Sequence, residues 1–214
     1  MNSTANLTAN ATTSSATLVD ALASRSGAVR AASVLFVAVL TAAAAQVSVP
    51  LPFTEVPFTF QPMVVLLGGL ALGARLGFAS QVLYLAAGIA GLPVFAASPV
   101  LPPGALRLLG PTGGYLMAYP IAAFVVGHLA ERGFDRRYLT SVLAMLAGLV
   151  IVYACGVTWL GLFARGSAQA VPVGLPAAFI AGVVPFVLAD LVKLLAAAGV
   201  LPGVWRLLGR TDTR

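Results

Sequence analysis

Two charged side chains lie inside an otherwise apolar stretch near the end of the chain. Asp190 and Lys193 are three residues apart within residues 186–195, whose other members are all apolar. This spacing places both on one face of a helix. If the helix spans a membrane, each buried charge costs several kcal/mol and usually faces an interior site or pathway. A purely structural ion pair is the alternative, but such a pair rarely adds stability over apolar packing. We therefore expect Lys193 to meet an anionic or carbonyl group of a small ligand, with Asp190 accepting from the ligand's donors.

The other residue types that commonly carry chemistry are scarce. The single cysteine, Cys155, excludes an internal disulfide and multi-cysteine metal sites, and the single histidine, His128, excludes two-histidine zinc motifs. Gly113 and Gly114 lack the lysine and the spacing of a phosphate-binding loop. No nucleophile, base and oxyanion set can be assembled. The sequence thus predicts neither an enzyme nor a metal or cofactor site, and any ATP-driven role would need other subunits.

The composition shows which solvent these residues occupy. Of 214 residues, 60% are hydrophobic and 8% are charged, and the mean hydropathy is +1.00. A soluble domain is about 45–50% apolar and about 25% charged, so this chain cannot cover a water-facing surface and must be embedded in lipid. The net charge of +6 lies in short clusters beside apolar runs, as in cytoplasmic membrane loops. Nucleic acid is therefore not an expected partner.

The apolar runs predict an all-α bundle of six transmembrane helices. A helix needs roughly 20 apolar residues to span the hydrocarbon core, and two of the six runs are shorter than that. Residues 1–26 form a polar tail that we expect to be disordered, residues 27–205 form the membrane domain, and residues 206–214 form a short basic tail. The predicted helices cover residues 31–49, 62–72, 77–90, 114–129, 139–163 and 176–200.

The basic residues predict the orientation of the bundle. Cytoplasmic loops carry an excess of lysine and arginine, and an even number of helices puts both termini on one side. The other side holds only Arg107 and Arg165. Both termini should therefore be cytoplasmic. The basic residues on their side are Arg25, Arg30, Arg75, Arg132, Arg136, Arg137, Arg206, Arg210 and Arg214.

Two loops on the predicted outer side are rich in proline. They cover residues 50–61 and 91–113. Proline fixes φ and removes a backbone donor, so we expect stiff, irregular segments. Such loops over a small bundle either cover a cavity or serve as ordinary connectors, and composition does not choose between the two.

Small residues recur along the first helix. Ala38 and Ala42 are four apart, and so are Gly69 on the second predicted helix and Gly73 directly after that helix. This spacing allows close helix approach in lipid. It fits either internal packing or a docking face for another membrane subunit.

Five short motifs occur in order along the chain. They are VPFTFQ at residues 56–61, the glycine-rich run ending at Gly73, GLPVF at 91–95, LGPTGGY at 109–115, and DLVK at 190–193. Together they resemble the BioY family, the biotin-specific S components of energy-coupling-factor (ECF) vitamin transporters. The resemblance covers roughly residues 33–200.

The resemblance implies a six-helix bundle in the cell membrane that captures biotin from outside. It implies partners as well: a transmembrane coupling subunit and two ATPase subunits. It further implies that Ala38 and Ala42 contact the coupling subunit.

Biotin has an apolar body with polar ends, so its site should have mostly apolar walls and a few placed polar groups. We expect it in the outer half of the bundle, beneath the proline-rich loops. Phe53, Phe58, Tyr84 and Tyr115 are candidate wall residues, and Gln61 is a candidate partner of the ureido ring. Spacing leaves open which of the two charged residues of the last helix meets the ureido ring and which meets the carboxylate.

Two other interpretations remain open at this level. The chain could be an S component for another vitamin, which competition binding among vitamins would reveal. It could also be a structural or assembly subunit without a ligand. In that case Asp190 and Lys193 could be replaced together by leucine without functional loss.

Overall fold

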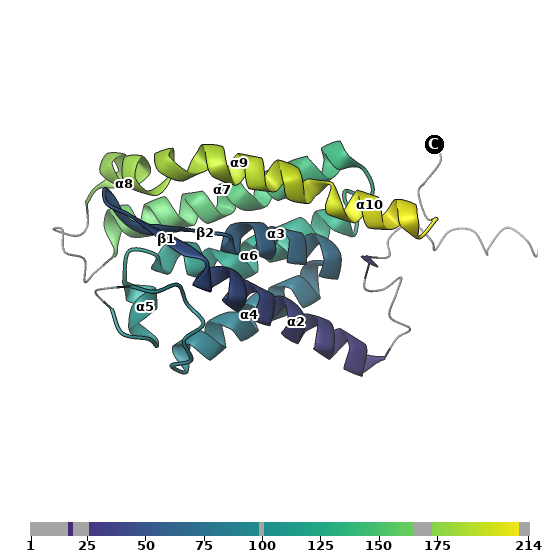
Figure 1. Ribbon diagram of the computed structural model, residues 1–214, viewed down its shortest axis with the longest axis horizontal. Helices are drawn as coiled ribbons and strands as arrows, with labels where there is room; N and C mark the ends of the chain where they lie inside the picture. Colours follow the sequence, from purple (N-terminus) through teal and green to yellow (C-terminus); the bar gives the residue numbers. More distant parts are fainter. Residues whose placement is uncertain (1–16, 19–25, 99–100, 165–172, 210–214) are drawn as a thin grey trace, which may run out of the picture.

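The computed structural model describes residues 17–18, 26–98, 101–164 and 173–209 of the chain, and it is mostly helical (Figure 1). The two tails expected from the sequence lie largely outside the described residues; of the N-terminal tail, Thr17 is buried. The elements are α2 (Gly27–Gln46), β1 (Ser48–Leu51), β2 (Thr54–Thr59), α3 (Gln61–Leu72), α4 (Ala74–Ile89), α5 (Leu106–Leu109), α6 (Gly113–Ala130), α7 (Tyr138–Leu162), α8 (Leu175–Gly182), α9 (Val184–Ala198) and α10 (Val200–Leu207).

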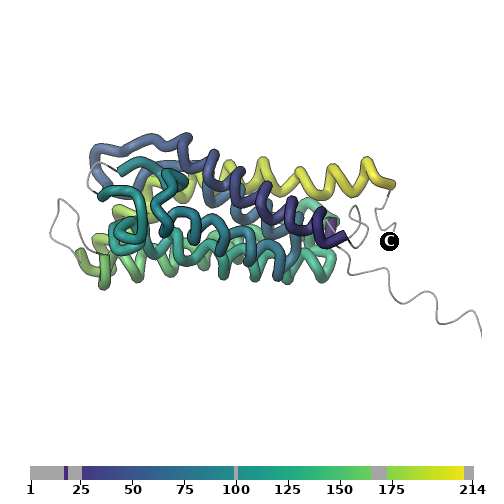
Figure 2. The backbone as a smooth tube through the Cα atoms, turned by 90° about the horizontal axis from the view of Figure 1, so that it is seen from below, coloured from purple at the N-terminus to yellow at the C-terminus, as the bar shows by residue number. Residues whose placement is uncertain are grey.

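The helices lie along the long axis of an elongated bundle. Both views place the β1–β2 hairpin, α5 and α8 at one end, and α10 with the beginning of α2 at the other (Figures 1 and 2). Within the described residues, four helical segments are long and apolar enough to cross a membrane: Gly27–Gln46, Gly113–Ala130, Tyr138–Leu162 and Val184–Leu207. The apolar helices α3 and α4 are shorter. These elements match the predicted ranges to within a few residues at most of their ends.

Apolar side chains cover the outside of the bundle as well as its core. Leu188 is 74% exposed, and Phe36, Val150 and Ile180 are each about as exposed. Exposed apolar patches on this scale mark a surface that something other than water covers. Together with the long apolar helices, this surface is that of a membrane protein.

Helix α6 lies at the centre and packs against α3, α4 and α7. Glycines allow this close approach. A Cβ at Gly127 would collide with the backbone of Gly73 and Ala74, and a Cβ at Gly69 would meet the backbone of Ala123. Small residues are the usual means by which helices approach closely in lipid.

The first helix ends earlier than the sequence predicts, and part of the first proline-rich loop is regular. Helix α2 ends at Gln46, and β1 pairs antiparallel with β2, with Ser48 opposite Thr59 and Val49 opposite Phe58. The bundle is therefore not purely α-helical. Both strands of a two-stranded ribbon are edge strands, where proline is tolerated because the missing donor would not have been paired.

The predicted last helix, residues 176–200, is interrupted. Helix α8 ends at Gly182 and α9 begins at Val184, with Pro185 in its first turn. Proline cannot donate to the preceding turn and its ring clashes with it, so the helix breaks here.

The small residues of α2 point inward. Ala38 is 6% exposed and belongs to the core, and Ala42 is half-buried against it. The outward face carries Phe36 and Val39, which are 65% and 58% exposed. This geometry differs from the docking face expected at Ala38 and Ala42, and it favours the alternative of internal packing.

Candidate functional site

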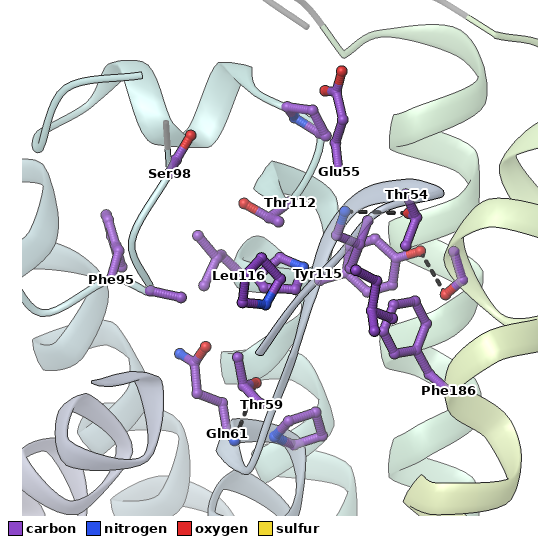
Figure 3. Close-up of a pocket in the computed structure, with 18 of the residues that line it drawn as sticks. Thr54, Glu55, Thr59, Gln61, Phe95, Ser98, Thr112, Tyr115, Leu116 and Phe186 are labelled. Carbon is purple, nitrogen blue, oxygen red and sulfur yellow. Dashed lines mark hydrogen bonds between the residues drawn. The ribbon is translucent and has the colours of Figure 1, made fainter. Parts of the chain in front are cut away.

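A cavity of about 380 Å³ lies at the hairpin end of the bundle. Its wall combines the hairpin, parts of residues 95–98 and 101–112, the beginning of α6, the middle of α7, and the break between α8 and α9. Figure 3 shows Phe95 on one side and Tyr115 with Phe186 on the other. The volume falls within the roughly 300–1,000 Å³ of small-molecule pockets. The polar side chains in the wall are those of Thr54, Glu55, Thr59, Gln61, Ser98, Arg107, Thr112, Tyr115, Tyr119, Tyr153 and Asp190.

Asp190 and Lys193 are paired as the spacing predicts, on the inward face of α9. The Lys193 ammonium lies 2.5 Å from Oδ1 of Asp190 and donates to the Thr59 carbonyl oxygen at 2.7 Å. It also lies 4.0 Å from the centre of the Phe58 ring, within the range of a cation–π contact. The other carboxylate oxygen of Asp190 accepts a hydrogen bond from the Tyr153 hydroxyl at 2.6 Å.

The two charges differ in what they face. Asp190 lines the cavity, whereas Lys193 is not part of its wall. The ammonium lies behind the carboxylate, where it joins α9 to the end of β2. Lys193 therefore compensates Asp190 and fixes the hairpin, whereas the direct ligand contact expected for Lys193 would require it to line the cavity.

Gln61 is the first residue of α3, and its amide points into the cavity (Figure 3). Its Nε2 donates to the Tyr84 hydroxyl at 2.6 Å. That hydroxyl donates to the Val94 carbonyl oxygen at 3.3 Å. Tyr84, 1% exposed, thus lies behind the wall. It supports Gln61 and does not itself line the cavity.

The break between α8 and α9 contributes to the wall. The Tyr115 hydroxyl donates to the Gly182 carbonyl oxygen at 2.9 Å, a carbonyl that lies at the C-terminal end of α8. The Tyr115 ring fits between Gly156 and Gly182, where a Cβ at either position would collide with it. This fixes Tyr115 as a rigid part of the cavity.

The structure does not bring the two phenylalanines expected in the wall to the cavity. Phe53 is 62% exposed in the turn of the hairpin. Phe58 is half-buried and covers the Lys193 ammonium. Alternation along a strand explains the second case, because Thr59 and Phe58 point to opposite faces.

Sequence analysis did not single out Arg107, which lies in the short helix α5 and lines the cavity. Arg107 is 8% exposed, and among the described residues its guanidinium has no ion pair, while Nε lacks a hydrogen-bond partner. Burial lowers the pKa of this guanidinium from its ordinary value, yet arginine stays charged in proteins. The clue in the sequence was its place as one of two arginines on the predicted outer side.

A buried, uncompensated cation is costly unless an anion joins it. The cavity therefore offers carboxylates at Asp190 and, from the hairpin, at Glu55, a cation at Arg107, an amide at Gln61 and largely apolar surfaces between them. This combination suits an uncharged group with N–H donors joined by an apolar body to an anion.

Comparison with known proteins agrees with this chemistry. The model of the BioY family matches residues 12–210. A protein named as a probable biotin transporter BioY from Pyrococcus horikoshii is 45% identical over 163 residues, which cover 76% of this chain and 87% of that protein. The biotin transporter BioY of Thermotoga maritima is 39% identical over 150 residues, covering 70% and 81%.

A solved structure has the same fold. It is described as the S component for biotin from an ECF-type ABC transporter, and it superposes with a TM-score of 0.71 over 86% of this chain and 95% of that chain, at 22% identity. The family match extends over nearly the whole chain, and the relatives are similar over most of their length. The chain belongs to the BioY family.

Proposed function

We propose that this protein is the substrate-capturing S component of an ECF-type transporter and that it takes up biotin across the cell membrane. The single observation that carries the proposal is the cavity in which Asp190 and Arg107 are placed in one largely apolar wall. The names of the relatives and of the solved structure support biotin as the substrate. The role is binding and transport, not catalysis.

The charges orient biotin within the cavity. Asp190 would repel the valerate carboxylate, so it accepts from a ureido N–H. Arg107 takes the carboxylate, because the guanidinium fork matches a carboxylate and gains the partner that it lacks in the described residues. Lys193 keeps Asp190 ionised from behind.

Gln61 is a second partner of the ureido ring, and Tyr115 with Phe186 forms the apolar wall beside it. Tyr84 acts behind Gln61. Phe58 takes part indirectly by covering Lys193.

The bundle crosses the membrane with its cavity end outside. We assign the six membrane segments to α2, α3, α4, α6, α7 and the interrupted series α8 to α10. The excess of arginine at the opposite end supports cytoplasmic termini. Membrane lipid covers the exposed apolar side chains.

Transport requires partners that supply energy. We propose a transmembrane coupling subunit and two ATPase subunits, as the description of the fold relative as part of an ABC transporter suggests. The docking surface lies on outward-facing side chains, since Ala38 is in the core.

Uptake in cells tests this function. Biotin-auxotrophic cells without their own transporter are supplied with this chain and an ECF module, and uptake of labelled biotin is measured. We expect uptake with the native chain and none when both Asp190 and Lys193 are replaced by leucine. Unimpaired uptake by that double variant would contradict the proposed site, and stimulation of another vitamin's uptake would contradict the substrate.

A further inference from the structure

The hydroxyl of Tyr84 joins the cavity to the loop that covers it. It accepts from Nε2 of Gln61 at 2.6 Å and lies 3.3 Å from the Val94 carbonyl oxygen, to which it donates. Gln61 belongs to α3, Tyr84 to α4, and Val94 to the loop after α4. Three segments therefore meet at one buried hydroxyl.

The loop around Val94 is held by side chains on its inner side. Gln46, the last residue of α2, donates from Nε2 to the Pro93 carbonyl oxygen at 3.2 Å. The Phe95 ring stacks edge-on against Tyr84 at 5.4 Å and lies against Gly88, where a Cβ would collide with it. Phe95 lines both the cavity and a neighbouring hollow of about 480 Å³ that Pro93 also lines. This loop thus separates the cavity from the hollow beside it.

The hydroxyl has one proton, and that count decides the orientation of Gln61. If the Tyr84 proton goes to Val94, the hydroxyl oxygen can only accept from Gln61, so Nε2 is committed and Oε1 is left to the cavity. If Gln61 turned its amide over, Tyr84 would have to donate to Oε1 and would lose Val94. The closed loop and an acceptor in the cavity therefore occur together.

We propose that Tyr84 is a positioning residue that makes Gln61 an obligate acceptor for a ligand N–H and couples that recognition to the closed state of residues 92–98. This rests on the proposed function, in which the ligand is biotin. Asp190 takes one ureido N–H and Gln61 takes the other. A ligand that carries a hydrogen-bond acceptor in place of the second N–H favours the turned amide and thereby releases the Val94 carbonyl.

A double-mutant cycle tests whether Tyr84 acts through Gln61. Tyr84→Phe keeps the ring that packs on Phe95 and removes only the hydroxyl. We expect it to weaken biotin binding by about tenfold in the native background and by clearly less in a Gln61→Leu background, where only the hydrogen bond to Val94 is left to lose. Tyr138→Phe is the matched control. It removes the hydrogen bond of another tyrosine hydroxyl to a backbone carbonyl, that of Leu195, outside the cavity. It should leave the biotin affinity unchanged in both backgrounds. Equal effects of Tyr84→Phe in both backgrounds would overturn the proposal.

Ligand selectivity gives a readout that a purely structural role would not move. Binding of biotin is compared with binding of the two cyclic carbamate analogues in which one ureido N–H each is replaced by a ring oxygen, which can accept a hydrogen bond but cannot donate one. The native protein should reject both. Tyr84→Phe should bind one of the two analogues about as well as it binds biotin, since Gln61 is then free to turn and to donate from Nε2 to the ring oxygen. An unchanged ratio of affinities would contradict the positioning role.

Opening of the loop at residues 92–98 can be measured in the absence of biotin. Ala96→Cys in a Cys155→Ser background reports opening through the rate of maleimide labelling. Tyr84→Phe should raise that rate several-fold, as should Gln46→Leu, which removes the other anchor but should leave selectivity intact. If the native protein binds no biotin, the proposed function fails, while an unchanged labelling rate in Tyr84→Phe would overturn the coupling to the loop, whatever the rate in Gln46→Leu.

Discussion

At the scale of single residues, the site depends on how each buried charge is compensated. The Lys193 ammonium has a carboxylate, a backbone carbonyl and an aromatic face around it. The Asp190 carboxylate has the ammonium and the Tyr153 hydroxyl. Arg107 is the exception, since no carboxylate pairs with it among the described residues, and under the proposed function the ligand supplies that carboxylate. Asp190 is therefore held ready for donors, and Arg107 attracts an anion.

Removing one or both charges of the α9 pair separates its structural role from its binding role. Lys193→Met should lower thermal stability strongly, because breaking a buried ion pair costs about 3–5 kcal/mol. The double variant Lys193→Met, Asp190→Asn should recover most of that loss at similar volume. Biotin affinity should stay weakened by roughly tenfold to a hundredfold in both. Thermal unfolding measures the stability of each variant, and titration with biotin measures its affinity. A double variant that binds biotin normally would show that the pair has a structural role only.

Arg107→Gln should remove the preference for a charged ligand. Hydrogen bonds to charged groups contribute about 1.5–3 kcal/mol, so affinity for biotin should fall while affinity for the uncharged biotin amide changes little. Competition binding measures both. Arg75→Gln, at an exposed position of α4, is the control for a lost positive charge. An equal loss of affinity for biotin and for the biotin amide would show that Arg107 does not bind the carboxylate.

The sequence indicated some of these residues and could not indicate others. Asp190 and Lys193 were recognisable because charges are rare in apolar helices, and Gln61 because it ends a family motif. The orientation of these side chains could not be recognised, because spacing shows which residues share a helical face but not which atom reaches a cavity. Arg107 looked like an ordinary loop cation because its burial depends on how residues 91–113 fold.

At the scale of elements, the helices were predictable because long apolar runs in lipid have one favourable backbone structure. Proline caused both main errors. Its density at residues 50–57 predicts irregular structure, but edge strands tolerate it there, and Pro185 breaks the helix predicted at residues 176–200. The resulting break places the Gly182 carbonyl oxygen where Tyr115 reaches it.

Adjacent positions on α2 test its orientation. Ala38→Trp should destabilise the protein and abolish binding, because overpacking a buried site forces neighbours apart. Val39→Trp, one residue further and 58% exposed, should bind biotin normally. Thermal unfolding and binding on both purified variants measure this. Normal binding by Ala38→Trp with loss of uptake would restore the docking role of that alanine.

The loop between α6 and α7 should make stability depend on pH. Asp135 is fully buried and accepts from Trp205 Nε1 of α10 at 2.6 Å, and burial raises its pKa. A carboxyl whose pKa is raised on folding stabilises the fold fully below its unfolded pKa of about 3.9 and loses that contribution as the pH rises through the folded value. Asp135→Asn keeps an acceptor for Trp205 but does not ionise, so its stability does not fall as the pH rises through the folded pKa of Asp135.

The stability of Asp135→Asn relative to the native chain should therefore grow as the pH rises from about 4. Thermal unfolding across that range measures the difference. A difference that shrinks with rising pH would mean that the nearby Arg136, 3.5 Å away, outweighs burial.

At the scale of the whole molecule, an apolar exterior surrounds a core with the ligand-sized, largely apolar cavity at one end. Composition predicted the membrane environment, because 18 charged residues, 12 basic and 6 acidic, cannot solvate a surface of this size. The cavity itself could not be derived from composition. It arises where the hairpin, the loop at 95–112 and the α8–α9 break converge, and that convergence involves contacts far apart in sequence.

The most direct test of the central claim is a calorimetric titration of the purified full chain with biotin. We predict saturable binding of one biotin per chain that an excess of thiamine or riboflavin does not displace, and that Asp190→Leu with Lys193→Leu abolishes although that variant remains folded. Absence of binding by a folded native chain, or equal binding by the double variant, would contradict the account.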